Sequence, residues 1–243
     1  MSDPDMARSF GREAGAYDRA RPEYPAEAVE WLVGSARRVA DVGAGTGKLT
    51  RGLLALGREV VAVEPDEKMR DTLRAALPEV ECLAGSAEDL PLADGSVEAV
   101  TFGQAWHWVD PPVACRAAAR VLTPEGVLGL VWNVRDPEVD WVAEMTRIIR
   151  ISNGEAMAAL ATSPPFTEPF TSAETRRWTW SRTLTREAVL DLVRSRSYYI
   201  TAPPDEQERI LDGMRTLLAT HPALADRDDI EMPYVTIAWR VTR

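Results

Sequence analysis

Short apolar runs alternate with amphipathic segments along the first half of the chain. The apolar runs are rich in Val and Ala, as in buried strands, and the segments between them repeat apolar residues at helical spacing. Gly57 and Pro78 end the first two helical segments. The pattern predicts strands over residues 38–42, 59–64, 80–84, 97–103 and 127–132, with helices over 48–56, 67–76 and 113–122. Strands that alternate with helices in this way form a parallel sheet joined by crossover helices.

Beyond Asn133 the helical segments become longer. The spacing predicts helices over residues 141–152, 186–197 and 205–221 and strands over 175–182 and 234–241. We expect the two late strands to complete a seven-stranded, mostly parallel sheet in an α/β fold with helices on both faces. The expected organisation is a single domain over 1–243, in which residues 1–37 form a helical cover, 38–135 the core, and 136–243 the last strands and an insertion.

Composition narrows the class of protein. With 243 residues and 45% hydrophobic side chains, the chain can bury a substantial core. It has no apolar run of about 18 residues and no basic, apolar leader, so we expect a cytoplasmic protein without a membrane span. A net charge of −10 argues against binding of nucleic acid, which needs clustered Lys and Arg. Cys82 and Cys115 lack the spacing of a metal site, and we expect free thiols.

The first predicted strand ends in three glycines at every second position, Gly43, Gly45 and Gly47. Glycine has no Cβ, so a ligand can lie directly against the main chain of such a loop. A dinucleotide site requires the spacing G-x-G-x-x-G, but the third position is Lys48 when counted from Gly43 and Thr50 when counted from Gly45. The spacing therefore disfavours a nicotinamide oxidoreductase. An ordinary glycine-rich turn between strand and helix remains the alternative.

The segment from Asp41 to Gly47 resembles motif I of the class I S-adenosylmethionine (SAM)-dependent methyltransferases, in which this loop lies under the methionine part of SAM. The resemblance implies a Rossmann-like α/β fold and the use of SAM, with S-adenosylhomocysteine as the product. It also implies which positions contact the cofactor. The expected cofactor-binding residues are Tyr17, Arg21, Asp41, Gly43, Ala44, Gly45, Gly47, Glu64, Pro65, Met69, Ser86, Ala87, Glu88 and Gln104.

Two segments after later strands support the resemblance. Glu64 ends the second strand, where a carboxylate can accept hydrogen bonds from the ribose diol of SAM; a solvated carboxylate and an acceptor for an NAD ribose are the alternatives. The segment from Ala84 to Pro91 resembles the family segment that holds adenine through a side chain and adjacent backbone amides. The family often has Asp at the position of Ser86, whose hydroxyl can still meet the adenine amino group, and a simple polar loop is the alternative.

The segment Gln104-Ala105-Trp106-His107-Trp108 follows the fourth strand. In an open α/β sheet the carboxyl ends of the first and fourth strands face one crevice at the topological switch point, so we expect chemistry beside this segment. With Asp-Leu-Pro-Leu before it and Arg-Val-Leu-Thr-Pro-Glu-Gly after it, the block is similar to the small-molecule branch that includes trans-aconitate methyltransferases. The candidate catalytic residue is His107, either as a general base or as a residue that only shapes the pocket.

The N-terminal segment and a set of aromatic residues are the remaining candidates for contact with the acceptor. The segment from Tyr17 to Pro25 resembles the family's cover over SAM and substrate, in which Arg21 pairs with a carboxylate of either; the alternative is a surface helix whose aromatic residues pack on the sheet. Asp110-Pro111-Pro112-Val113 lacks the final Tyr of an amino-methyltransferase motif, and we expect Asp110 to cap a helix instead. The expected substrate-contacting residues are Trp106, Trp108, Trp132 and Tyr198.

The sequence thus predicts in-line transfer of the sulfonium methyl group to an oxygen, nitrogen or carbon of a small-molecule acceptor. We expect no metal in this reaction and a monomer or homodimer. Two other functions stay open. A methyltransferase of protein or RNA is disfavoured by the acidic composition, and a SAM-binding protein that does not methylate would carry the same loop residues.

Overall fold

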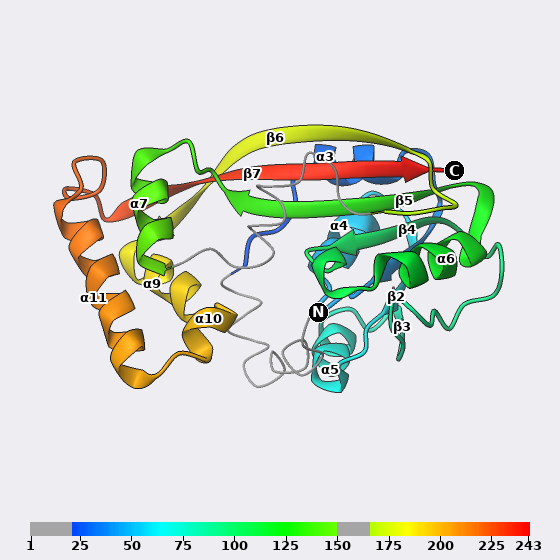
Figure 1. Cartoon of the computed structure of the whole chain (residues 1–243), viewed down its shortest axis with the longest axis horizontal. Helices are drawn as coiled ribbons and strands as arrows, with labels where there is room; N and C mark the ends of the chain where they lie inside the picture. The colour runs from blue at the N-terminus through cyan, green and yellow to red at the C-terminus, as the bar shows by residue number, and fades with distance from the viewer. Residues whose placement is uncertain (1–20, 150–165) are drawn as a thin grey trace.

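Seven strands form one sheet in the order β3-β2-β1-β4-β5-β7-β6 (Figure 1). The computed structural model describes residues 21–149 and 166–243, so the predicted contact of Tyr17 lies outside the described residues. Strands β1 to β5 pair in parallel, whereas β7 runs antiparallel to both β5 and β6. This confirms the predicted seven-stranded, mostly parallel sheet. The strands are β1 (Arg38–Val42), β2 (Glu59–Val63), β3 (Glu81–Leu83), β4 (Val97–Gly103), β5 (Leu122–Arg135), β6 (Ser172–Thr185) and β7 (Asp229–Thr242).

Helices cover both faces of the sheet, as predicted. Successive residues of a strand point to opposite faces, and in β1 Val39 packs in the core under α3 and α4 while Ala40 packs in the core under α6. Helix α5 covers the same face as α4, because apolar residues of both lie in one cluster with Ala62 of β2. The helices are α3 (Ala26–Val33), α4 (Lys48–Ala55), α5 (Glu67–Ala76), α6 (Pro111–Val121), α7 (Asp140–Ile149), α9 (Arg186–Arg194), α10 (Ser197–Ile200) and α11 (Pro204–Thr220).

Helices α7, α9, α10 and α11 gather at one end of the long strands β5, β6 and β7, away from α5 and β3 (Figure 1). We call this group the helical cap. It has its own apolar core, in which Met145, Leu192 and Met214 are fully buried, and Tyr234 of β7 contributes to that core. Within residues 21–149 and 166–243, no helix has the length and apolar character needed to cross a membrane.

Most predicted bounds in the first half are close to the observed ones, but β5 begins earlier than expected. Val97 of β4 pairs with Leu122 and Ala99 pairs with Val127, so residues 123–126, which precede the predicted strand at 127–132, form an irregularity inside β5. The late strands are also longer than predicted, because β6 and β7 pair along their whole length. In the cap, the helix predicted over 186–197 ends at Arg194, and α10 begins a new helix at Ser197.

Candidate functional site

Three segments converge at the carboxyl ends of β1 and β4, where the strand order changes direction. The loop after β1 touches the loop after β4, since a Cβ on Gly43 would lie 2.7 Å from the Cβ of Ala105. Gly103 ends β4 and lies against the segment before α3, since its Cβ would stand 2.9 Å from the hydroxyl of Tyr24. The structure therefore brings the glycine loop, the Gln104 segment and the chain near Tyr24 to one place.

The three glycines of the loop serve different purposes. All have left-handed backbones, with φ of 66° at Gly43, 56° at Gly45 and 87° at Gly47. A side chain at Gly43 would collide with Ala105, and one at Gly47 would stand unusually close to Leu73 and Leu77, at 3.2 and 3.0 Å. Among the described residues, nothing lies within 4 Å of the place where a Cβ on Gly45 would stand. The bare backbone at Gly45 thus faces open space among the described residues, and a ligand could approach it directly.

Glu64 joins the glycine loop to the end of β2. Its carboxylate accepts hydrogen bonds from the backbone N–H of Gly45 at 2.8 Å and of Asp66 at 2.9 Å. Burial raises the pKa of Glu64, and the two backbone hydrogen bonds oppose that shift. Each carboxylate oxygen keeps a second lone pair. Glu64 can therefore hold the loop in place and still accept a ribose hydroxyl, which stays a prediction.

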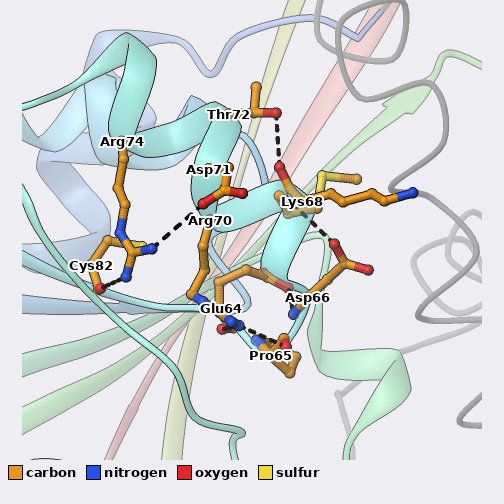
Figure 2. A network of polar contacts seen from close by, with 10 residues as sticks. Glu64, Pro65, Asp66, Lys68, Arg70, Asp71, Thr72, Arg74 and Cys82 are labelled. Carbon is orange, nitrogen blue, oxygen red and sulfur yellow. Dashed lines mark hydrogen bonds and ion pairs between the residues drawn. The ribbon is translucent and has the colours of Figure 1, made fainter.

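The turn from β2 into α5 is fixed by side chains of the helix itself, as Figure 2 shows. Arg70 donates to the carbonyls of Glu64 at 2.8 Å and Pro65 at 2.7 Å. Asp66 caps the helix by accepting from the backbone N–H of Met69 at 3.0 Å. The sequence reading missed Arg70, although an Arg in the first turn of the helix that follows a strand is the signal that would have indicated it. These contacts place Glu64, Pro65 and Met69 together beside the loop.

Asp41 lies beneath the glycine loop. It is fully buried and accepts hydrogen bonds from the hydroxyls of Thr50 on α4 at 2.6 Å and of Thr101 on β4 at 3.4 Å. Burial raises the pKa of Asp41 to about 7, although these hydrogen bonds favour the charged form. In this structure Asp41 connects the strand to the helix after the loop. A direct contact with the cofactor stays a prediction.

The expected adenine segment is a closed turn in the structure. The Ser86 hydroxyl accepts from the backbone N–H groups of Glu88 and Asp89, both at 3.3 Å. Glu88 accepts from the backbone N–H of Asp110 at 3.0 Å, which connects this turn to the start of α6. Asp110 caps α6 as predicted, and Ala87 is buried. The amides of Glu88 and Asp89 are thus bonded to Ser86, and contact of this segment with adenine stays a prediction.

Gln104 begins a polar network that the sequence reading missed. It has a positive φ of 58°, an uncommon conformation for a residue other than glycine, and its side chain donates to the carbonyl of Asn133 at 2.7 Å. Asn133 donates to the carbonyl of Glu23 at 3.0 Å and accepts from Thr236 at 2.6 Å. Trp180 donates to Thr236 at 2.8 Å. An Asn inside the apolar run of β5 was the available signal.

His107 lies in the short 3-10 helix after β4, spanning Trp106–Trp108. Burial, assisted by the positive charge of Arg21, lowers the pKa of His107 to about 4. The imidazole is therefore neutral at pH 7, as expected, but it is a much weaker base than free histidine. This weak basicity favours the pocket role over the general-base role.

The four aromatic residues predicted to contact the acceptor occupy different places. Trp106 is 1% exposed and packs edge-to-face on Phe102, and Trp132 is 4% exposed in the same core. Tyr198 packs in the helical cap. Trp108 is half-buried, with its ring centroid 4.8 Å from that of His107. The structure thus gives Trp106 and Trp132 a packing role, and contact of any of the four with the acceptor stays a prediction.

A pocket of ≈ 760 Å³ opens beside the three converging segments. Arg21 and Tyr24 line it, as does Lys48, which directly follows the glycine loop. The sequence reading included Arg21 but missed the contribution of β6, because nothing in the sequence indicates which residues that strand faces. The complete lining is Arg21, Glu23, Tyr24, Pro25, Lys48, Trp180 and Arg182. In the described parts of the chain, no group of three or more His, Cys, Asp or Glu side chains is placed to hold a metal ion.

The known proteins that are similar to this chain are methyltransferases, in agreement with the geometry of the site. The profile of a family described as "Methyltransferase domain" matches residues 40–130. An uncharacterized methyltransferase of Mycobacterium tuberculosis is 52% identical over 98% of this chain and 97% of the relative. An uncharacterized methyltransferase-like protein of Schizosaccharomyces pombe is 33% identical over 98% of this chain and 97% of its own.

A solved structure from Anaeromyxobacter dehalogenans, which carries the name of a type II methyltransferase, is 27% identical. It matches 92% of this chain and 97% of its own with a TM-score of 0.67. The sheet order, the glycine loop at its switch point and this similarity over nearly the whole length lead to one family. The chain belongs to the class I SAM-dependent methyltransferases.

Proposed function

We propose that this methyltransferase transfers the methyl group of SAM to an oxygen, nitrogen or carbon atom of a small-molecule acceptor. The observation that carries the proposal is the position of the ≈ 760 Å³ pocket. Lys48 of its lining follows Gly47, and Tyr24 touches the end of β4 at Gly103. The pocket therefore adjoins the predicted cofactor loop, and its volume lies in the range of about 300–1,000 Å³ that small-molecule sites occupy.

The residues at the switch point fit SAM. The backbone at Gly45 has no side chain in the way, and Glu64 has lone pairs for a ribose diol at the neighbouring strand end. SAM supplies a sulfonium methyl group that a nucleophile displaces in line. The chain's own contribution is to orient the acceptor and exclude water, for which the buried aromatic side chains around His107 are suited. Because its pKa is lowered, the neutral His107 side chain forms a hydrogen bond with the molecule to be methylated and does not remove a proton from it.

Calorimetric titration of the purified chain with SAM, S-adenosylhomocysteine and NAD in parallel tests the proposal. We expect micromolar binding of the first two ligands and none of NAD. A site that already holds co-purified SAM or its product would give no binding signal. Precipitating the protein and analysing the supernatant for these two compounds tests for this. Absence of binding by a chain that holds no co-purified ligand would contradict the proposed use of SAM.

The acceptor class needs a separate test. The enzyme is incubated with a cell extract and SAM that carries a tritiated methyl group, and the products are separated by molecular mass. The fraction that holds the label distinguishes a small-molecule acceptor from protein or RNA. We expect label in the small-molecule fraction of a cell extract. Label in protein or RNA would instead favour a macromolecular acceptor. We also propose that the enzyme is cytoplasmic. We propose that it works as a monomer or homodimer, and light scattering after gel filtration measures its molecular mass.

A further inference from the structure

Trp180 of β6 forms one wall of the ≈ 760 Å³ pocket. Its ring is stacked on that of Tyr234 of β7, with 4.9 Å between the ring centroids and 21° between the planes. Its indole N–H donates to the Thr236 hydroxyl at 2.8 Å. One face and the only polar atom of the side chain are therefore engaged within the protein. The half-buried indole thus offers the pocket carbon and π surface without a hydrogen-bond donor.

Thr236 holds the indole in this orientation. It is fully buried, and its hydroxyl donates its single hydrogen to Asn133 Oδ1 at 2.6 Å while it accepts from Trp180. Asn133 in turn donates to the carbonyl of Glu23 at 3.0 Å, and Glu23 lines the pocket. These hydrogen bonds therefore connect two walls of the pocket, one on β6 and one before α3. Buried bonds of this kind fix a side chain in one position, so the aromatic wall is preorganised.

Two further residues with ring side chains line the same pocket, Tyr24 and Pro25. Tyr24 reaches the end of β4, since its hydroxyl stands 2.9 Å from the place of a Cβ on Gly103. The pocket thus extends from the aromatic wall on β6 to the switch point, where the predicted cofactor loop lies. A ring that packs against Trp180 would therefore lie in the pocket that adjoins the predicted methyl donor.

We infer that Trp180 determines the specificity of the pocket and selects an acceptor with a planar aromatic ring, which packs against the indole. The inference rests on the proposed function of the pocket and names its substrate class. Two aromatic rings attract each other in offset-stacked and edge-to-face arrangements beyond the effect of the apolar area that they bury, whereas a saturated ring of the same size gains only from the buried area. Thr236 is a positioning residue, because it is fully buried and acts through the indole.

A matched pair of neutral probes tests the inference on the full chain saturated with S-adenosylhomocysteine. Benzamide and cyclohexanecarboxamide carry the same amide group, the first on a planar and the second on a saturated six-membered ring. Ligand-observed NMR titration measures both Kd values, because it detects the weak binding of such small probes. Tetramethylammonium is the third probe, since an organic cation also binds the face of an indole.

Variants of β6 and β7 separate the effect of the indole from other effects. Trp180→Leu removes the aromatic ring and keeps an apolar side chain. Trp178→Leu is the matched control, since Trp178 points to the same face of β6 but packs against Trp31 of α3, outside the described lining of the pocket. Thr236→Val removes the hydroxyl that holds the indole, and Thr236→Ser restores it.

We expect the wild type to bind benzamide about two- to twelvefold more tightly than cyclohexanecarboxamide, which is the range of an aromatic pair. This preference should disappear in Trp180→Leu and stay unchanged in Trp178→Leu. The inference would be overturned by a wild type without the preference or by a preference that survives Trp180→Leu. Tighter binding of tetramethylammonium than of benzamide would also overturn it, because the indole would then select a cation.

The positioning role of Thr236 has its own readout. Thr236→Val should lower the preference for benzamide and Thr236→Ser should restore it, whereas a general loss of structure would weaken the binding of both amides alike. If Thr236→Val does not fold, Trp180→Phe makes the same comparison, since it removes the indole N–H and keeps an aromatic ring. An undiminished preference in the variant tested would contradict the positioning role.

Titration with S-adenosylhomocysteine alone separates this inference from the proposed function. Its Kd should be the same for the wild type and Trp180→Leu, because Trp180 lies on β6 and most of the predicted cofactor residues follow β1 to β4. Absence of binding by the wild type contradicts the proposed use of SAM. Normal binding of S-adenosylhomocysteine without a preference for benzamide contradicts only the acceptor class.

Discussion

Gly43 and Gly45 show how residues that look equivalent in a motif differ in their physical constraints. Both have a left-handed backbone, which costs an L-residue roughly 1–2 kcal/mol. At Gly43 a side chain would also press against Ala105, whereas at Gly45 it would enter open space. Packing and the left-handed backbone together constrain the first glycine, whereas at the second the backbone conformation is the constraint among the described residues, and a ligand in the open space would add another.

This difference gives a paired prediction. Gly45→Ala should lower the free energy of unfolding of the ligand-free chain by about 1–2 kcal/mol, and Gly43→Ala should lower it by about 1–3 kcal/mol more, because of the collision. In the presence of SAM, Gly45→Ala should lose at least tenfold in affinity despite its small effect on stability. Urea unfolding and calorimetry measure the two quantities. Unchanged SAM affinity of Gly45→Ala would show that the open space is not the cofactor site.

The weak basicity of His107 gives a second prediction. Replacement by Asn should lower kcat/KM by less than about fivefold, because a group with a pKa of about 4 contributes little as a base at neutral pH. The pH profile of kcat/KM should show no titration near pH 6.5 in the wild type, so the wild type and the variant should have profiles of the same shape. A fall of about 10²-fold or more, accompanied by loss of such a titration, would assign His107 the general-base role.

Asp41 predicts a pH dependence of stability. Its pKa is about 7 in the folded chain and 3.8 ordinarily, so between these values the folded state binds a proton that the unfolded state has lost. The stabilisation from this proton is complete below pH 3.8 and disappears as the pH rises through 7. Asp41→Asn imitates the protonated form, and its Tm relative to wild type should rise between about pH 4 and pH 7. A difference in Tm that does not change with pH would contradict the shifted pKa.

At the scale of elements, Asn133 connects strands that the site needs in fixed positions. Its side chain bonds the chain at Glu23 and the Thr236 hydroxyl of β7, and its carbonyl holds Gln104. Asn133→Ala should lower the free energy of unfolding by about 2 kcal/mol, because it leaves buried polar groups unpaired. Thr179→Ala, at an exposed position of β6, should change it by about 0.5 kcal/mol or less. If the two variants lower the free energy of unfolding equally in denaturant titration, the hydrogen bonds of Asn133 do not contribute to stability.

The same elements show how far the sequence predicts the structure. The parallel half was predictable because each of its strands is a short apolar run that ends at a glycine or a polar residue, as β1 ends before Gly43. The late strands were found but placed too short, because residues such as Ser172 and Thr185 at the two ends of β6 are polar on an edge strand. Pairing with β7 extends them, and pairing partners are a long-range property that local patterns do not contain.

The candidate site divides in the same way. The glycine loop and Glu64 were predictable from spacing, and the structure joins them through the 2.8 Å contact to Gly45. The burial of Trp132 and the contribution of Trp180 and Arg182 to the pocket were not predictable, because they depend on which face of the sheet each residue occupies. A sequence motif indicates the backbone conformation of a short segment, whereas an acceptor pocket is formed by segments that are distant in sequence.

At the scale of the whole molecule, the long strands connect the parallel half to the helical cap. Along β7, Tyr234 lies in the core of the cap while Ile237 and Trp239 lie in the core under α6. We therefore expect one cooperative unfolding transition, in which the calorimetric and van't Hoff enthalpies agree. Differential scanning calorimetry measures both. Two separated transitions would show that the cap unfolds independently of the sheet.

The outermost position of β6 also has a consequence for protein engineering. The residues that would recognise the donor come from the first half of the sheet, while Trp180 and Arg182 of the pocket lining come from β6. A mutational library restricted to residues 172–242 would therefore explore new acceptors while leaving donor chemistry intact. In such a library, Trp180 and Arg182 are the first positions to vary, because both line the pocket.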